Sequence, residues 1–330
     1  MKKNLTFVLV LLSVVLFVFL GIALGRYTSS ALVAEAPNPA CMSTMTDIIA
    51  SAQGDVYNMG NDPDYVEPES YYLATYSVKG NAITDPTLES VPNDLLDEQK
   101  DSVLQTEAWN LFTDLIPAED RKMVAQYNVF TDGFENTLAA VDQKKNNPSQ
   151  WILEVDLADL QNKDALMFTI IHEYAHLLTL NASQVTPDQE IVDDPYNLSL
   201  QTDKAAACPN YFTGTGCSHA DSYVHAFYNR FWVDINDEWA KVDALQYETE
   251  DLTPYYDGLY GFYKTHQDQF LDDYSTTHPT EDIAESFTYF VFSPKPTGDS
   301  IKEQKIAFFY EYPELVRLRE DILNGACSAK

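Results

Sequence analysis

The chain has 330 residues, 45% of them hydrophobic, which is enough for one or two globular domains with a sizeable core. Its 51 acidic residues outnumber 20 basic ones and give a formal net charge of −31 at pH 7. This charge excludes nucleic acid as a partner, because phosphate binding needs a basic face. An acidic surface favours solubility first and basic substrates second.

Residues 1–30 are expected to form a membrane anchor or a signal segment. Lys2 and Lys3 precede Leu5–Leu24, an uncharged and mostly aliphatic stretch. Its length suits a spanning helix, which needs about 20 apolar residues, better than the shorter apolar core of a cleaved signal peptide. Lysines before the helix should stay in the cytoplasm, so the anchor would hold the rest of the chain outside the cell. Secretion after signal cleavage is the alternative.

Four cysteines outside such an anchor suggest disulfides, for which three pairings are possible. Cys208 and Cys217 flank a short glycine-containing loop that they could close. Cys41 and Cys327 would then tie the two ends of the ectodomain together. None of the four has the C-x-x-C spacing of a zinc ribbon.

Residues 31–70 are rich in Ser, Ala, Asn, Asp and Pro and are expected to be a stalk or linker. Residues 71–330 are expected to form one domain, with a sheet and a central helix over 71–181 and a helical part over 182–330. Aromatic, β-branched or alternating patterns predict four strands, and apolar spacing predicts a helix between the first two. The strands are Tyr71–Ile83, Val124–Phe130, Thr137–Val141 and Trp151–Leu157, and the helix is Ser102–Leu115.

The segment Asp164–Asn181 (DALMFTIIHEYAHLLTLN) is apolar, has the length of a helix, and contains the motif H-E-x-x-H. Asp164 is a plausible N-cap, and Asn181 a plausible residue just past the end. Residues four apart lie on the same face of a helix, so His172 and His176 can offer two nitrogens to one metal ion. Zinc suits such a site, since it accepts imidazole and carboxylate ligands and leaves a position open for water. Glu173 would take the proton of that water as the hydroxide attacks a carbonyl group.

A zinc site of this kind needs a third ligand. The H-x-x-G-x-x-H continuation of metzincins is absent, because Thr179 and Ala182 stand at the required positions. Glu281 and Glu285 are four apart and share a face of a helix expected to start near Pro279. They could serve as a metal ligand and as a carboxylate that orients a ligand histidine. An amphipathic helix with acids on its wet face explains the spacing equally well.

H-E-x-x-H followed at a distance by E-x-x-x-(D/E) resembles the gluzincin class of zinc metallopeptidases. The segment Tyr274–Phe287 is especially similar to the catalytic domain of anthrax lethal factor and related bacterial zinc peptidases. The resemblance implies zinc ligands His172, His176 and Glu281, with Glu173 as general base and Glu285 as the second-shell carboxylate. It also implies that the Tyr274 hydroxyl steadies the developing oxyanion or protonates the leaving amine.

The resemblance covers two short blocks, and 182–280 contains an insertion longer than in compact gluzincins. It further implies that Trp151–Leu157 is an edge strand beside the active-site helix, against which an extended peptide pairs. The expected fold is therefore α+β and zincin-like: a small mixed sheet packed on the H-E-x-x-H helix, followed by a mainly helical C-terminal half.

These observations predict a zinc-dependent endopeptidase that faces the outside of the cell and cleaves peptide or protein substrates. One alternative is a non-catalytic surface binding protein with a vestigial zinc site, although such a protein needs neither Glu173 nor Tyr274. Another is a zinc hydrolase of cell-wall peptides, which the motif does not distinguish from a protease.

Overall fold

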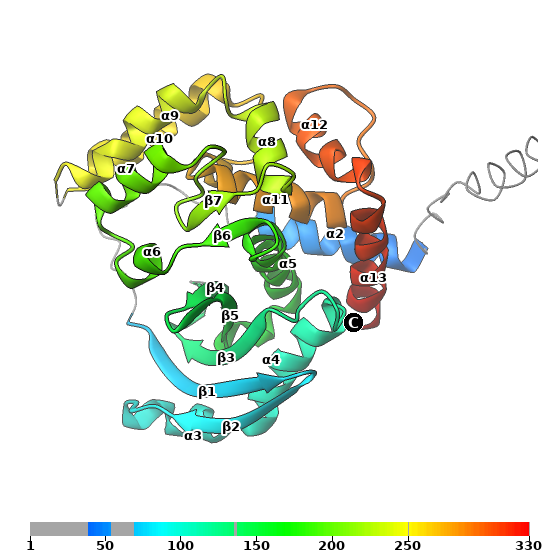
Figure 1. Ribbon diagram of the computed structural model, residues 1–330. Helices are drawn as coiled ribbons and strands as arrows, with labels where there is room; N and C mark the ends of the chain where they lie inside the picture. The colour runs from blue at the N-terminus through cyan, green and yellow to red at the C-terminus, as the bar shows by residue number, and fades with distance from the viewer. Residues whose placement is uncertain (1–38, 54–68, 135–136, 250, 330) are drawn as a thin grey trace, which may run out of the picture. The chain divides into compact units, whose positions relative to one another are not determined.

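The computed structural model describes residues 39–53, 69–134, 137–249 and 251–329. Residues from Ala40 onward form one compact unit. Within the described residues it combines a five-stranded mixed sheet with twelve α-helices, which confirms the predicted combination of a small mixed sheet and a mainly helical C-terminal half (Figure 1).

The sheet has the strand order β2-β1-β3-β5-β4. Its strands are β1 (Tyr71–Lys79), β2 (Ala82–Leu88), β3 (Val124–Thr131), β4 (Ala139–Lys144) and β5 (Asn147–Asp156). Only β3 and β5 pair in parallel, and the other neighbours are antiparallel. The predicted strand Tyr71–Ile83 is in fact a hairpin, because the chain turns at Gly80 with a φ of 64°, where glycine is favoured.

Helices cover one face of this sheet and form the C-terminal half. Before the central helix lie α2 (Pro39–Gln53), α3 (Leu96–Lys100) and α4 (Ser102–Leu115), and α4 has the predicted bounds. The central helix is α5 (Lys163–Leu180). After it come α6 (Gln189–Asp193), α7 (Leu198–Ala207), α8 (Tyr223–Phe231), α9 (Asn236–Asp243), α10 (Thr253–His266), α11 (Pro279–Phe292), α12 (Ile301–Phe308) and α13 (Pro313–Ser328).

Helix α5 is the element that joins the two halves, since it contacts the edge strand β4 on one side and α11 on the other (Figure 1). Thirteen of its 18 residues are buried. Such a helix, apolar on nearly all sides, belongs in the middle of a domain. The two motif histidines are therefore held inside the protein, where an unpaired polar group is costly.

Part of the expected stalk is structured. Residues 39–53 form α2, and its Met45 and Ile48 side chains are buried in the main core. The remainder of the predicted stalk, residues 31–38 and 54–68, lies outside the described residues.

The predicted membrane location needs correction. No helix in the part of the chain that the structure describes is long and apolar enough to cross a bilayer. The segment that led to this prediction, Leu5–Leu24, lies outside the described residues.

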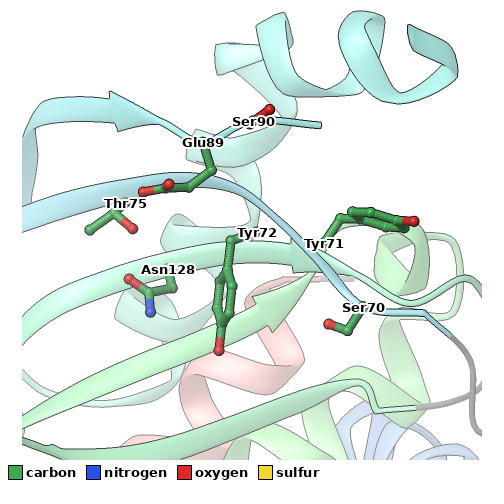
Figure 2. A pocket seen from close by; sticks show the side chains of 7 residues that line it. All are labelled: Ser70, Tyr71, Tyr72, Thr75, Glu89, Ser90 and Asn128. Atoms are coloured by element: carbon green, nitrogen blue, oxygen red, sulfur yellow. The ribbon is translucent and has the colours of Figure 1, made fainter. Parts of the chain in front are cut away.

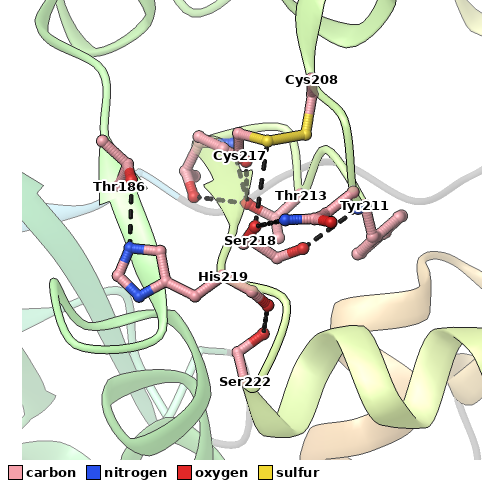
Figure 3. The surroundings of a disulfide bond; sticks show 11 residues. Thr186, Cys208, Tyr211, Thr213, Cys217, Ser218, His219 and Ser222 are labelled. Atoms are coloured by element: carbon pink, nitrogen blue, oxygen red, sulfur yellow. Dashed lines mark hydrogen bonds between the residues drawn. A yellow bond between two sulfur atoms is a disulfide. The ribbon is translucent and has the colours of Figure 1, made fainter.

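One predicted disulfide is present, between Cys208 and Cys217. Figure 3 shows that it closes the loop before β7 (Gly216–Ser218), a short strand paired with β6 (Val185–Pro187). Cys327 is also disulfide-bonded. The predicted partner, the Cys41 side chain, lies outside the described residues, so that pairing stays a prediction.

Candidate metal centre

The candidate site lies where α5 meets the first turn of α11. Both helices have fixed beginnings: the Asn162 side chain accepts the N–H of Ala165, and the His278 side chain accepts the N–H of Thr280. Pro279 occupies the first helical position of α11, where its missing N–H does no harm. These caps fix where each helix starts. They therefore also fix which side chains of α5 lie opposite which side chains of α11.

Three atoms from these helices converge on one point. Nε2 of His172 lies 3.1 Å from Oε2 of Glu281 and 3.2 Å from Nε2 of His176. Nε2 of His176 lies 3.2 Å from the same Glu281 oxygen. The triangle is nearly equilateral, and no other element comes between its corners.

The sides of the triangle match the distances between ligand atoms in a tetrahedral zinc site. Zinc binds nitrogen and oxygen at about 2.0–2.1 Å in tetrahedral geometry, which places neighbouring ligand atoms about 3.3 Å apart. The three observed separations are within about 0.2 Å of that value. Two imidazoles and one carboxylate are also the donor set that zinc accepts in catalytic sites, so the residues fit the ion.

Glu285 completes the surroundings of His172. Its Oε1 lies 2.9 Å from Nδ1 of His172, an ion-pair contact that is bent for a hydrogen bond. Glu285 is one turn beyond Glu281 on α11, and its side chain is 8% exposed. A carboxylate at Nδ1 favours a proton on that nitrogen, which leaves the lone pair of Nε2 free for a metal.

The electrostatics of the site are those of opposite charges held close together. Burial alone would lower the pKa of His172, but the carboxylates of Glu281 and Glu285 outweigh it and raise that pKa well above its ordinary value. Burial alone would raise the pKa of Glu281, but the two imidazoles lower it well below its ordinary value. The raised pKa of His172 therefore favours a protonated ring, whose positive charge compensates carboxylate charge.

Glu173 lies beside the triangle and faces the sheet. Its carboxyl accepts a hydrogen bond from the backbone N–H of Val141 on β4. Burial raises the pKa of Glu173 above its usual value, an effect that the two motif histidines reduce. A carboxylate with a raised pKa is better suited to accept a proton near neutral pH.

The sequence analysis expected Trp151–Leu157 to be the edge strand beside the H-E-x-x-H helix. The strand at this edge is β4 instead. Most of that segment belongs to β5, which pairs with β3 on one side and β4 on the other. Its alternation of buried Trp151, Leu153 and Val155 was correct, but alternation shows only that one face is buried. It does not show which strand ends the sheet.

Tyr274 lies in the short 3-10 turn Tyr274–Thr276 that precedes α11. Its ring centre is 5.7 Å from that of His172, and its hydroxyl donates a hydrogen bond to the Glu281 carboxylate. Burial raises the pKa of Tyr274 well above its ordinary value, so the hydroxyl keeps its proton. The structure thus brings all six residues predicted for the site into one place.

Three other histidines, His219, His225 and His266, have partners away from the site. His219 contacts Thr186 and the carbonyl of Ser183 next to the disulfide-closed loop, as Figure 3 shows for Thr186. His225 contacts Asn229, and His266 contacts Glu238. Within the described residues, the potential metal ligands that converge in groups of three or more all lie at this centre: His172, Glu173 and His176, together with Glu281.

A hollow on the far side of the sheet does not belong to this centre. It is lined by Ser70, Tyr71, Tyr72, Thr75, Glu89, Ser90 and Asn128, and none of these is a predicted ligand (Figure 2). The Tyr72 hydroxyl and the Asn128 amide both donate to Glu154, so the polar groups at its base already satisfy each other. The converging atoms of His172, His176 and Glu281 make the metal centre the better candidate for the functional site.

Sequence reasoning missed two groups around the site. One is the backbone of β4, which only the strand order reveals. The other is a buried ion pair between Asp282, the residue after Glu281, and Lys305. The sequence gives only a weak signal for this ion pair. Lys305 begins the otherwise apolar run KIAFF, residues 305–309.

The arrangement can hold a divalent cation and has a carboxylate and a phenol beside it. Comparisons with known proteins give no further guidance: no protein-family model, no curated protein and no solved structure matches this chain.

Proposed function

We propose that this protein is a zinc-dependent endopeptidase with a zincin-like active site. The observation that carries the proposal is the triangle of His172 Nε2, His176 Nε2 and Glu281 Oε2, with sides of 3.1, 3.2 and 3.2 Å. These three residues would hold the metal. When bound, zinc would lower the pKa of water and polarise a carbonyl group.

The residues around the ion have separate tasks in the proposed reaction. Glu173 takes a proton from the attacking water and later passes it to the leaving amine. Glu285 keeps the His172 ring turned so that Nε2 faces the metal. The Tyr274 hydroxyl, which stays protonated, donates a hydrogen bond to the oxygen on which negative charge develops.

The substrate we propose is an extended peptide lying along β4. As an edge strand, β4 has backbone groups on one side that no other strand of the sheet uses. A peptide added there would gain main-chain hydrogen bonds, while pockets between side chains would choose the sequence. Because β4 contacts α5 near Glu173, such a peptide would pass the catalytic carboxylate.

The first test separates metal binding from catalysis. Glu173→Gln keeps the shape of the side chain and the hydrogen bond from Val141, but cannot take a proton. We expect zinc content close to that of the native protein and a loss of peptide hydrolysis of at least about 100-fold. Peptidase activity is measured on a library of quenched fluorescent peptides, and metal content by elemental analysis. Unchanged hydrolysis would refute the role of Glu173.

The second test concerns the third ligand. Glu281→Ala removes one corner of the triangle and should lower zinc affinity by several orders of magnitude. Glu238→Ala is a matched control. It also removes a glutamate that pairs with a histidine, since Glu238 on α9 contacts His266, but it does so away from the site. Full zinc occupancy of the Glu281 variant in dilute zinc would move the third ligand elsewhere.

A further inference from the structure

Lys305 lies fully buried behind the first turn of α11. Its Nζ is 2.6 Å from Oδ2 of Asp282, and both side chains are 0% exposed. The attraction in such a buried pair barely repays the cost of removing both charges from water. A pair of apolar residues would pack these helices at least as well, so stability alone is a poor explanation for it.

Aromatic rings fix the two charges in place. Nζ of Lys305 lies 3.9 Å from the ring centre of Phe270 and 5.9 Å from that of Trp232. Nε1 of Trp232 donates a hydrogen bond of 2.7 Å to the same Asp282 oxygen that faces Lys305. The Asp282 carboxylate is thus held from two directions, by a cation on α12 and by an indole on the α8 side. Both aromatic residues come from the 182–280 segment, for which the sequence had suggested no role.

Asp282 lies on the same helical turn as Glu281, the proposed third ligand. Asp282 follows Glu281 directly, and its N–H donates to the carbonyl of His278 at the start of α11. Because the carboxylate is held by Lys305 and Trp232 and lies only two bonds from Cα, it restrains this first helical turn against rotation. Such a rotation would carry the Glu281 carboxylate away from the two histidine nitrogens.

A second carboxylate lies near the same cation. Asp272 is attracted by Lys305 and repelled by Glu285, the partner of His172. It also accepts hydrogen bonds of 2.8 and 2.6 Å from the N–H and hydroxyl of Ser275, next to Tyr274. The ammonium therefore stands behind both segments that supply Glu281 and Tyr274.

We propose that Lys305 is a positioning residue for the metal centre. Its ammonium fixes Asp282, and through Asp282 the first turn of α11, so that Glu281 remains at liganding distance from both histidines. This inference rests on the proposed zinc site. It also gives the 182–280 segment a task, which is to supply the aromatic surroundings of this cation.

Two possible roles of Lys305, one through its electric field and one through its hold on α11, predict opposite changes in zinc affinity when the cation is removed. If Lys305 acted only through its electric field, its loss would strengthen the binding of another cation nearby. If it acts by holding the first turn of α11, its loss weakens zinc binding. The sign of the change therefore distinguishes the two roles, and no activity measurement is needed.

The experiment compares zinc affinity and unfolding in Lys305→Met and in a matched control, Arg319→Met. Arg319 is also a buried cation on a neighbouring helix, and it donates to the carbonyls of Phe290 and Ser293 at the opposite end of α11. Zinc affinity is measured by competition with a chromophoric chelator under conditions where circular dichroism shows folded protein. We expect the Lys305 variant to bind zinc at least about tenfold more weakly, as for other residues that support metal ligands. The Arg319 variant should stay within about twofold of the native affinity despite its loss of stability.

A second variant covers the case in which Lys305→Met does not fold, because that change leaves Asp282 buried without a counter-charge. Asp282→Asn with Lys305→Met removes both charges and keeps an acceptor for Trp232. It should fold and still bind zinc at least about tenfold more weakly. Native or tighter zinc affinity in either folded variant would overturn the inference. If instead the native chain binds no zinc, the proposed function itself fails, so the two failures are distinct.

Discussion

Zinc uptake by this protein should release protons, and the affinity for zinc should therefore fall as the pH is lowered. Nε2 of His172 is 3.1 Å from Glu281 and Nδ1 is 2.9 Å from Glu285. A carboxylate at each nitrogen stabilises the doubly protonated ring, which is why the pKa of His172 is well above its ordinary value. A metal can use Nε2 only after the proton on that atom has left.

The magnitude follows from counting protons. At neutral pH His172 carries two ring protons, of which the one facing Glu285 can stay when zinc binds. At least one proton is then displaced per zinc, and each displaced proton makes the dissociation constant about tenfold larger per unit decrease in pH, or about 1.4 kcal/mol. The sign is fixed by the raised pKa: below it the imidazolium competes with zinc, and above it the competition ends.

The assay is chelator competition between pH 6 and pH 7.5, with the chelator affinity corrected at each pH. Calorimetry in two buffers of different ionisation enthalpy counts the released protons independently. His225→Ala is the control, because His225 contacts Asn229 away from the site and should leave the slope unchanged. A dissociation constant that stays constant over this range would mean that His172 gives up no proton to the metal, and the site would have to be reassigned.

Three more predictions follow from the same structure. Glu285→Gln removes the charge 2.9 Å from Nδ1 of His172 and should weaken zinc binding by about 10-fold, with native zinc affinity as the contrary result. Replacing Cys208 and Cys217, nine positions apart, by serine should lower the free energy of unfolding by about 3 kcal/mol in urea titrations, whereas reduction of the native protein, which also breaks the disulfide of Cys327, should lower it further. Burial and, to a smaller extent, the neighbouring Asp132 side chain together raise the pKa of Asp156 to about 7, against the effect of two backbone N–H groups. Stability from this carboxyl is complete below its unfolded pKa of about 3.9 and is lost as the pH rises toward 7, so Asp132→Asn should make unfolding measured between pH 4 and pH 8 less pH-dependent.

Elements with a strong local pattern could be predicted from the sequence. Helix α4 has the predicted bounds, Ser102–Leu115, because its apolar spacing and the following Pro117 are both local signals. Helix α5 ends before Asn181, as predicted, but it begins two residues earlier than a cap at Asp164 would place it, since Asn162 and not Asp164 provides the cap. Strand order was not accessible in this way. Whether β4 or β5 forms the edge depends on which of them pairs with β3, and this long-range pairing has no local signal.

The site shows the same division between local and long-range information. The spacing of His172 and His176 is a property of one helix, so two of the three proposed ligands could be named from it. Glu281 could be named only through its resemblance to a family motif, because 104 residues separate it from His176. The spacing of Glu281 and Glu285 alone fitted a solvent-facing acidic stripe equally well. What distinguishes the two is burial, and Glu285 is 6% exposed.

The same contrast explains why α11 must be held so firmly. Helix α5 is secured by apolar packing on almost every side, so its histidines need little further support. Helix α11 carries acidic groups into the interior, and a buried carboxylate without a partner would pull the helix toward water. Buried cations act at both of its ends, Lys305 through Asp282 in the first turn and Arg319 through the carbonyls of Phe290 and Ser293 in the last. Helix α12, which supplies the cation at the first turn, therefore helps to present Glu281, although it contributes no ligand, whereas Arg319 on α13 secures the end of α11 that lies away from the site.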